Sequence, residues 1–348
     1  MPMNYTWDQA FGDGREAALV GGNAEKLLDA SRRLSLAGNT SASCFVEAPL
    51  LGAPDYDSLV IHNPRSLYPG CRVADPSQEL AQTVLSWAAG REGDRPYIHF
   101  ELDSAGAGAL SGVHCRMEGD MALAEGFFRA VGDPWRAGVL AWAVDRLPQG
   151  WFCSYAGVFP GRETGATRME VNPADEITRR ALCDKDYLRG FFDGLGFTAY
   201  DDRMLCDLAR LAEVDVPVSI QFDLLPDGFL PVCSFLSLYE HVRPDCSPLF
   251  RPDGGLTRSC RIYEEMGVSD GRWRLLEQCC FSQRRIFLKQ NVLEKRFNRC
   301  FMCCTKAKWI SAARSPAKFY LLMDVVRVFC ALEDLARGGE SGTRETES

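Results

Sequence analysis

Three lysines and a tyrosine gather near the end of the chain, in two runs that read as the strands of a β-hairpin. The first run is CCTKAKWI (303–310) and the second is AKFYLLM (317–323). Side chains alternate between the two faces of a strand, so Lys306 and Lys308 share one face, as do Lys318 and Tyr320 on the returning strand. If this face borders an enclosed space, the ammonium groups and the phenol form a site for an anion. If it borders solvent, the lysines are ordinary protection of a sheet edge.

The composition of the chain limits the classes of protein to which such a site can belong. The chain has 348 residues, of which 46% are hydrophobic and 25% are charged, as in soluble globular proteins with ample core. Its formal net charge is −8 at pH 7. Sequence-independent binding of nucleic acid or of anionic membranes depends on a positive surface, so we expect no nucleic-acid partner. Any anion site must therefore be local.

The chain carries no recognisable membrane or export signal. No apolar run approaches the roughly 20 residues that span a bilayer. The first residues, MPMNYTWDQAFGDG, lack the basic and apolar regions of a signal peptide. We therefore expect a cytoplasmic protein without membrane insertion.

Fifteen cysteines allow two interpretations. One group suggests a zinc site or an iron–sulfur cluster, but the usual pair of C-x-x-C motifs at a fixed separation is absent: Cys279, Cys280, Cys300, Cys303 and Cys304. Most others lie in apolar segments, where a reduced thiol behaves as a small hydrophobic group: Cys44, Cys153, Cys206, Cys233 and Cys330. The sequence predicts core thiols, with no zinc and no iron–sulfur cluster, and a reducing compartment makes disulfides unexpected.

Five segments share one pattern, a β-rich run, a turn and a second β-rich run, with helical patterning between successive segments. They lie near residues 44–63, 96–117, 151–171, 216–239 and 300–325. The region 256–298 reads as two or three further helices, and the acidity of the chain disfavours a DNA-binding helix-turn-helix there. The polar residues 336–348 are expected to be disordered. No comparable linker occurs earlier, so we expect a single domain over residues 1–335.

Each hairpin carries an apolar face and a polar face. The polar faces of the second to fourth hairpins carry Tyr97, His99, Glu101, Asp103, His114, Arg116, Arg168, Glu170, Gln221 and Asp223. If helices cover the apolar face, the polar face lies either in bulk water or inside a closed barrel. These residues differ from the interchangeable Lys, Glu and Thr of a solvated sheet, and ten strands enclose a lumen wide enough for ligands. We predict an α+β fold, a ten-stranded antiparallel β-barrel with a polar lumen and outer helices; an open sheet with a wet face is the alternative.

This pattern resembles the aromatic and peptide prenyltransferases of the ABBA, or PT-barrel, fold over roughly residues 41–325. In that family, five repeats of helices flanking antiparallel strand pairs form a ten-stranded barrel around the active site. Lys318-x-Tyr320 is similar to the strand positions that hold a prenyl diphosphate, and Lys306-x-Lys308 is similar to the family's basic strand pairs. Glu47, in CFVEAP, lies where indole-type members carry an acidic base. The strands with Arg168-x-Glu170 and Gln221-x-Asp223 depart from the family's fully basic pattern.

The resemblance implies a transferase that moves an isoprenoid from its diphosphate to an aromatic or peptide acceptor. Departure of a diphosphate needs cations and hydrogen-bond donors around the leaving oxygens, here Lys306, Lys308, Lys318, Tyr320, Arg116 and Arg168. Glu47 or Glu101 would accept the proton of the acceptor. The remaining substrate-binding residues would be Tyr97, His99 and Gln221. Asp103 and Asp223 would hold Mg²⁺, since hard cations take oxygen ligands and bridge phosphates.

Two other classes of function stay open. One is a different enzyme on the same barrel that acts on a peptide or a small acid. The other is a non-catalytic protein of a natural-product pathway that binds a precursor peptide at a sheet edge. Paired charges that only satisfy buried groups would also fill such a lumen.

Overall fold

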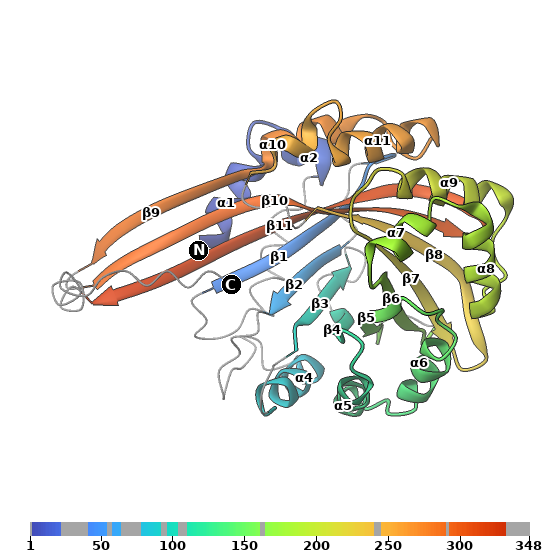
Figure 1. Cartoon of the computed structure of the whole chain (residues 1–348). Helices are drawn as coiled ribbons and strands as arrows, with labels where there is room; N and C mark the ends of the chain where they lie inside the picture. The colour runs from blue at the N-terminus through green and yellow to red at the C-terminus, as the bar shows by residue number, and fades with distance from the viewer. Residues whose placement is uncertain are drawn as a thin grey trace.

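The computed structural model describes residues 2–21, 41–53, 58–63, 78–91, 96–103, 110–160, 164–239, 245–289 and 292–331. Within these ranges a single curled antiparallel sheet carries helices on its outer side (Figure 1). No helix among these residues is both long enough and apolar enough to cross a membrane. The predicted tail, 336–348, lies outside the described residues, and the single-domain organisation stays a prediction.

The described strands are β1 (Ser41–Pro49), β2 (Ser58–Asn63), β3 (Ile98–Asp103), β4 (Leu110–Arg116), β5 (Trp151–Val158), β6 (Thr167–Pro173), β7 (Val218–Leu225), β8 (Gly228–Leu238), β9 (Phe281–Lys289), β10 (Val292–Ile310) and β11 (Ala313–Ala331). Their order in the sheet is β11-β1-β2-β3-β4-β5-β6-β7-β8-β10-β9, and β10 also pairs with β11. The pairings therefore run around ten strands and return to the first, which confirms the predicted ten-stranded antiparallel arrangement of five hairpins.

The sequence prediction of further helices over residues 256–298 is wrong for its second half. Helical structure ends at Cys279, and Phe281 begins β9, which pairs with the first nine residues of β10. The fifth hairpin is also longer than predicted, because β10 and β11 have 19 residues each. The run FSQRRIFLKQNVLEKRFNR shows no clear strand period because cations occupy both faces of β9, where Arg284 and Arg285 are both exposed.

The outer helices are α1 (Pro2–Phe11), α2 (Arg15–Leu19), α4 (Glu79–Ala89), α5 (Met121–Val131), α6 (Arg136–Val144), α7 (Glu176–Ala181), α8 (Lys185–Leu195), α9 (Asp202–Ala212), α10 (Ser247–Phe250), α11 (Gly255–Glu265), η3 (Arg272–Leu275) and α12 (Leu276–Cys279). Four of them begin at an aspartate whose carboxylate accepts a hydrogen bond from a backbone N–H of the first turn: Asp120, Asp175, Asp184 and Asp201. Such caps satisfy donors that the helix itself leaves unpaired, and each contributes about 1 kcal/mol.

The hydrophobic core lies between these helices and the outer face of the sheet. Phe191, Phe192 and Phe197 around α8 pack against Phe222 of β7, with ring centroids 5.3 to 6.4 Å apart. All four rings are at most 2% exposed. Full burial of such a ring stabilises the fold by about 1.5–3 kcal/mol. The outer face is thus apolar, as predicted, and the polar face of the sheet turns inward.

Candidate functional site

The hairpin of β10 and β11 places two of the three lysines directly opposite each other. Lys306 and Lys318 are cross-strand partners, and Lys306 is only 6% exposed. Thr305 points to the outside, where its hydroxyl is hydrogen bonded to Tyr239 and to Tyr263 at 3.0 and 3.1 Å. These buried contacts hold the outer face of β10 against α11, so that Lys306 is held toward the inside.

Glu47 of β1 binds both opposed lysines through one carboxylate oxygen. Its Oε1 lies 2.8 Å from Lys306 Nζ and 3.1 Å from Lys318 Nζ. Glu47 is 4% exposed and stands opposite Tyr320 in the pairing of β1 with β11. Burial, together with the Glu47 charge, raises the pKa of Tyr320 well above its usual value, so the phenol keeps its proton. The predicted base is therefore already engaged with two cations.

Lys308 differs from its two neighbours because it forms no ion pair within the described part of the chain. Burial is the main reason that its pKa falls from 10.5 to about 8. The charges of Lys306, Lys318 and Arg168 lower the pKa further. A partly buried ammonium beside three other cations is unfavourable, and an anion would relieve this repulsion.

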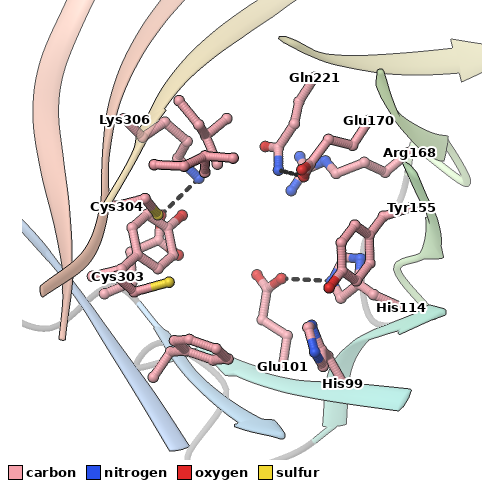
Figure 2. Close-up of a pocket in the computed structure, with 15 residues that line it drawn as sticks. His99, Glu101, His114, Tyr155, Arg168, Glu170, Gln221, Cys303, Cys304 and Lys306 are labelled. Atoms are coloured by element: carbon pink, nitrogen blue, oxygen red, sulfur yellow. Dashed lines mark hydrogen bonds and ion pairs between the residues drawn. The ribbon is translucent and has the colours of Figure 1, made fainter. Parts of the chain in front are cut away.

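The polar face of the sheet lines a cavity of about 130 Å³ (Figure 2). Its walls come from nine of the ten strands of the circuit and consist of Phe45, Glu47, His99, Glu101, His114, Tyr155, Arg168, Glu170, Gln221, Leu236, Leu238, Cys303, Cys304, Lys306 and Tyr320. Seven of the predicted site residues thus line this cavity: Glu47, His99, Glu101, Arg168, Gln221, Lys306 and Tyr320.

Charges on the β6 and β7 wall are paired. Arg168 donates from Nε and Nη2 to the two carboxylate oxygens of Asp223, at 2.9 and 3.1 Å. Burial disfavours the Arg168 cation, but Asp223 more than offsets this, and the pKa of Arg168 is raised above its ordinary value. Gln221 Nε2 donates to Glu170 Oε2 at 2.6 Å. The residues of β6 and β7 that differ from the family's fully basic pattern therefore form hydrogen bonds and an ion pair with one another across the two strands.

Glu101 of β3 and His114 of β4 form a buried pair on the opposite wall. His114 Nε2 lies 2.9 Å from Glu101 Oε2 (Figure 2). The imidazole lies over Gly157 of β5 and beside Gly112. A Cβ at Gly157 would lie 2.1 Å from His114 Nδ1, and one at Gly112 would lie 3.1 Å from Nε2. Two glycines thus make room for the ring, and any larger residue at Gly157 would displace it.

Three rings follow one another across this wall. The His99 ring lies 5.7 Å from Phe45 and 5.3 Å from Tyr155, measured between centroids. This row provides an aromatic surface for a flat or cationic group. Sequence reasoning missed Phe45, Tyr155, Leu236, Leu238, Cys303 and Cys304 as cavity residues. Alternation along β1 could have identified Phe45, because it lies two residues before Glu47 and so shares its face. It could not have identified both Cys303 and Cys304, because a β-bulge between Met302 and Cys304 places two consecutive residues on the cavity.

Five predicted site residues are not among those that line the cavity: Lys308, Lys318, Arg116, Tyr97 and Asp223. Arg116 forms an ion pair with Glu118 at 2.7 Å, and its side chain is 40% exposed. Its guanidinium also lies over the ring of Tyr97, which precedes β3, at 5.6 Å. The side chain of Asp103 lies outside the described residues. The diphosphate role of Arg116, the substrate role of Tyr97 and the metal role of Asp103 stay predictions.

The cysteines lie mainly in the core. Cys44, Cys153 and Cys233 are buried, as predicted, whereas Cys206 is partly exposed. Burial raises the pKa of the Cys44 and Cys153 thiols to about 12, so both stay protonated. Among the described residues, no group of three or more His, Cys, Asp or Glu side chains is arranged to hold a metal ion. Absence of zinc and of an iron–sulfur cluster stays a prediction.

Comparisons with known proteins identify the fold. No protein-family model matches the chain, and no curated protein is significantly similar to it in sequence. The crystal structure of 5-dimethylallyltryptophan synthase from Streptomyces coelicolor aligns with a TM-score of 0.51 and 10% identity, over 93% of this chain and 97% of that chain. The same enzyme in complex with DMASPP and Trp aligns at 0.46 and 12% identity, over 92% and 87%. AnaPT from Neosartorya fischeri aligns at 0.43 and 13% identity, over 84% and 79%. The chain therefore has the fold of the aromatic prenyltransferases, the ABBA or PT-barrel fold.

Proposed function

We propose that the chain transfers an isoprenoid from its diphosphate to an aromatic or peptide acceptor inside the barrel. One observation carries this proposal. Lys306 lines the cavity, Lys318 stands opposite it and shares its partner Glu47, and Lys308 on the same strand as Lys306 forms no ion pair in the described part of the chain. In a protein of net charge −8, this unpaired cation is best explained by an anionic ligand.

The leaving diphosphate would bind at the β10 and β11 wall. Lys306, Lys308 and Lys318 supply charge for the oxygens that gain electrons when the carbon–oxygen bond of the allylic diphosphate breaks. Tyr320 keeps its proton and adds a neutral donor. Arg168, fixed by Asp223, contributes a further cation from β6. The electron pair of the broken bond leaves with the diphosphate.

The acceptor would lie on the row of Phe45, His99 and Tyr155, where an aromatic ring finds parallel and edge contacts. A carbon or heteroatom of the acceptor forms the new bond to the allylic carbon and then loses a proton. We assign this proton to Glu101, which is 6% exposed and oriented by His114. Glu47 is the poorer base, because Lys306 and Lys318 favour its ionised form.

Asp223, one of the two predicted Mg²⁺ ligands, is poorly placed to bind a metal ion. Both oxygens of Asp223 accept hydrogen bonds from Arg168, so a metal ion at Asp223 would have to break this pair. The chemistry proposed above therefore uses the chain's own cations. Addition of Mg²⁺ tests this directly, because the earlier prediction of a metal at Asp223 requires dependence of turnover on the ion.

A different observation favours the alternative of a peptide-modifying or peptide-binding barrel without prenyl transfer. The residues that line the cavity include three carboxylates, Glu47, Glu101 and Glu170, against the two cations Lys306 and Arg168. A lumen with this lining binds a neutral peptide with less repulsion than a diphosphate. The cytoplasmic location and a place in natural-product biosynthesis are part of both proposals.

Thermal unfolding with and without ligand separates the two functions. We expect inorganic pyrophosphate, and dimethylallyl, geranyl or farnesyl diphosphate, to raise the melting temperature, because a ligand of the folded state stabilises it. Lys308→Ala or Lys318→Ala should weaken binding about ten- to a hundredfold, since a charge-assisted contact contributes roughly 1.5–3 kcal/mol. Tyr320→Phe should weaken it less, and the exposed Lys185→Ala should have no effect.

Activity completes the test. The wild type, incubated with each prenyl diphosphate and with tryptophan or a tryptophan-containing peptide, should yield a prenylated product by mass spectrometry. If none of these diphosphates stabilises the protein, with or without Mg²⁺, the transferase proposal loses its basis. The peptide-binding alternative then becomes the better explanation.

A further inference from the structure

A second pocket, of about 350 Å³, lies apart from the barrel cavity, since the two share no lining residue. It forms where β9 begins beside α10 (Figure 1). The start of α10, the end of α12 and the start of β9 supply its lining, which consists of Asp245, Cys246, Ser247, Phe250, Glu277, Cys280, Phe281 and Ser282. The reaction proposed above uses none of these residues, two of which carry thiols.

Cys246 and Cys280 meet on the wall of this pocket, where their thiols are hydrogen bonded to each other. Both are reduced in this structure. Cys246 is 6% exposed and Cys280 is partly exposed. The sulfur atoms of a disulfide are about 2 Å apart, and the Cβ atoms that carry them are roughly 4 Å apart. Two sulfurs in hydrogen-bond contact need only a small displacement to reach this geometry.

The backbone around both cysteines can accommodate such a displacement. Cys246 precedes α10, a helix of only four residues. Cys280 follows α12, with φ of −83° and ψ of 124°, and the pairing of β9 with β10 begins only at the next residue, Phe281. Neither cysteine lies in the interior of a helix or within a strand ladder. Segments of this kind adjust at a lower cost in free energy than the core of a sheet.

Two neighbouring cysteines are less suited to oxidation. Cys279 and Cys300 are 0% and 1% exposed, and neither is among the residues that line the pocket. The Cys279 thiol donates a hydrogen bond to the carbonyl oxygen of Leu275 at 3.6 Å. Cys300 lies within β10. A solute that enters the pocket therefore reaches Cys246 and Cys280 rather than these two buried thiols.

The reduced form of the pair is stable at neutral pH. The hydrogen bond with Cys246, burial and the nearby Cys300 raise the pKa of Cys280 well above its ordinary value, so this thiol keeps its proton. Thiol–disulfide exchange proceeds through the thiolate, which makes exchange at Cys280 slow. A slowly exchanging pair of thiols responds to a sustained change of redox conditions and not to a brief one.

We propose that Cys246 and Cys280 are a redox-sensitive modification site, at which a small disulfide of the glutathione type oxidises the two thiols to an intramolecular disulfide. A reducing environment keeps both thiols, and a more oxidising one closes the bond. Closure uses no group that lines the barrel cavity. It is therefore independent of the proposed prenyl transfer, and a negative result in either assay leaves the other proposal intact.

The exchange balances in two steps. The sulfur of Cys280, the more exposed of the two, attacks one sulfur of the small disulfide, whose S–S bond breaks, and the proton of Cys280 leaves with the first released thiol. The sulfur of Cys246 then attacks Cys280 Sγ and displaces the second small thiol, which takes the proton of Cys246. Two electrons pass from the cysteines to the small disulfide, which becomes two thiols.

A bond between Cys246 and Cys280 would close a loop that contains α10, α11, η3 and α12. Of these helices, α11 and α12 contact β10. Tyr263 of α11 is hydrogen bonded to Thr305 of β10 at 3.1 Å. A cross-link removes conformations from the unfolded chain, and more of them for a longer loop, so it stabilises the fold. Oxidation would thus restrain the helices that cover this part of β10.

The test equilibrates the full chain overnight in glutathione buffers of increasing oxidised-to-reduced ratio. Remaining thiols are blocked with N-ethylmaleimide, and the protein is digested without reduction for mass spectrometry. We expect a cross-linked peptide that joins Cys246 to Cys280, whose fraction rises with this ratio and which dithiothreitol abolishes. The melting temperature of the oxidised protein should exceed that of the reduced protein by about 3–5 °C.

Serine variants identify the pair. Cys246→Ser and Cys280→Ser should each lose the cross-link and the gain in melting temperature on oxidation. Under dithiothreitol both should melt close to the wild type, because serine is similar in shape and still forms a hydrogen bond. The matched control is Cys183→Ser, which removes an exposed thiol and should keep both the cross-link and the gain. The peptide map of the wild type decides the pairing even if a variant fails to fold.

Three results would overturn the proposal. Absence of the cross-link after equilibration with oxidised glutathione alone would show that the pair does not close. A stable mixed disulfide between glutathione and Cys280, without closure, would make the pocket a site for one thiol. A cross-link from Cys280 to Cys279 or to Cys300 would assign the oxidation to a different pair.

Discussion

Replacing Lys308 by methionine should stabilise the folded protein and, at the same time, weaken its response to pyrophosphate. Methionine is close to lysine in length and flexibility and brings no charge, so it can fill the same space. The ammonium of Lys308 forms no ion pair in the described part of the chain, and the charges of Lys306, Lys318 and Arg168 disfavour it. Its removal takes an unfavourable charge out of a partly buried position.

The size of the effect follows from the pKa. The pKa of Lys308 falls from 10.5 to about 8, chiefly through burial. Each pKa unit corresponds to about 1.4 kcal/mol, so the charged form is disfavoured by about 3 kcal/mol at most. Solvent screening of this partly exposed side chain reduces the gain, and we expect about 1–2 kcal/mol at pH 7.

The gain should also depend on pH in one direction. Below about pH 8 Lys308 is charged in the folded and unfolded chains, and the full cost is present. Between about pH 8 and 10.5 the folded state loses the proton before the unfolded state does. The unfolded state then binds more protons, so the free energy of unfolding of the wild type rises with pH. The advantage of Lys308→Met should therefore shrink across this window.

Urea denaturation at pH 7 and pH 10 measures both effects, each with and without pyrophosphate. Lys185→Met is the control, because Lys185 is exposed at the start of α8. The reasoning fails if Lys308→Met destabilises the protein at pH 7, or if its stability matches that of Lys185→Met. It also fails if the variant keeps the full stabilisation by pyrophosphate, because the unpaired cation then has no part in anion binding.

Three further predictions use the same cavity. Glu47→Gln leaves two lysines without their carboxylate and should lower the free energy of unfolding by about 3 kcal/mol, against about 1 kcal/mol for Glu170→Gln, which loses a bond to a neutral amide. Urea midpoints compare the two, and equal losses would contradict the ion-pair account. The affinity for pyrophosphate should fall as pH rises through about 8, where Lys308 loses its proton, and calorimetry showing a flat profile to pH 9.5 would refute this. Gly157→Ala places a methyl group 2.1 Å from His114 Nδ1 and should cost about 2 kcal/mol or more. Adding His114→Ala should recover part of this loss in a double-mutant cycle, and simple additivity would argue against the clash.

Much of the fold could be predicted because its signal is local. Alternation of polar and apolar residues identified five hairpins, and the apolar face required a cover of helices. The lysines at 306 and 318 and the tyrosine at 320 could be assigned to one face by counting along two strands. A turn of two residues, Ser311 and Ala312 with φ of 49° and 61°, joins these strands, although neither residue is the glycine or asparagine that favours such angles.

The strand β9 shows where local signals fail. A strand can be recognised from alternating apolar and polar residues when one of its faces is buried and the other is exposed to solvent. β9 has exposed residues on both faces, among them Arg285 and Ile286, so its period of two is lost and helix remained the better prediction.

The sequence by itself determined that His99, Glu101, Arg168, Gln221 and Tyr320 face the cavity, because the period of a regular strand decides the face on which each side chain lies. The tertiary structure alone decided which of them meet. Glu47 binds Lys306 and Lys318 from the other end of the chain because β1 pairs with β11. Gly157 makes room for His114 because β4 and β5, which belong to different hairpins, align in that register. Pairings between strands of different hairpins bring together residues that are far apart in the sequence, and no local pattern records their register.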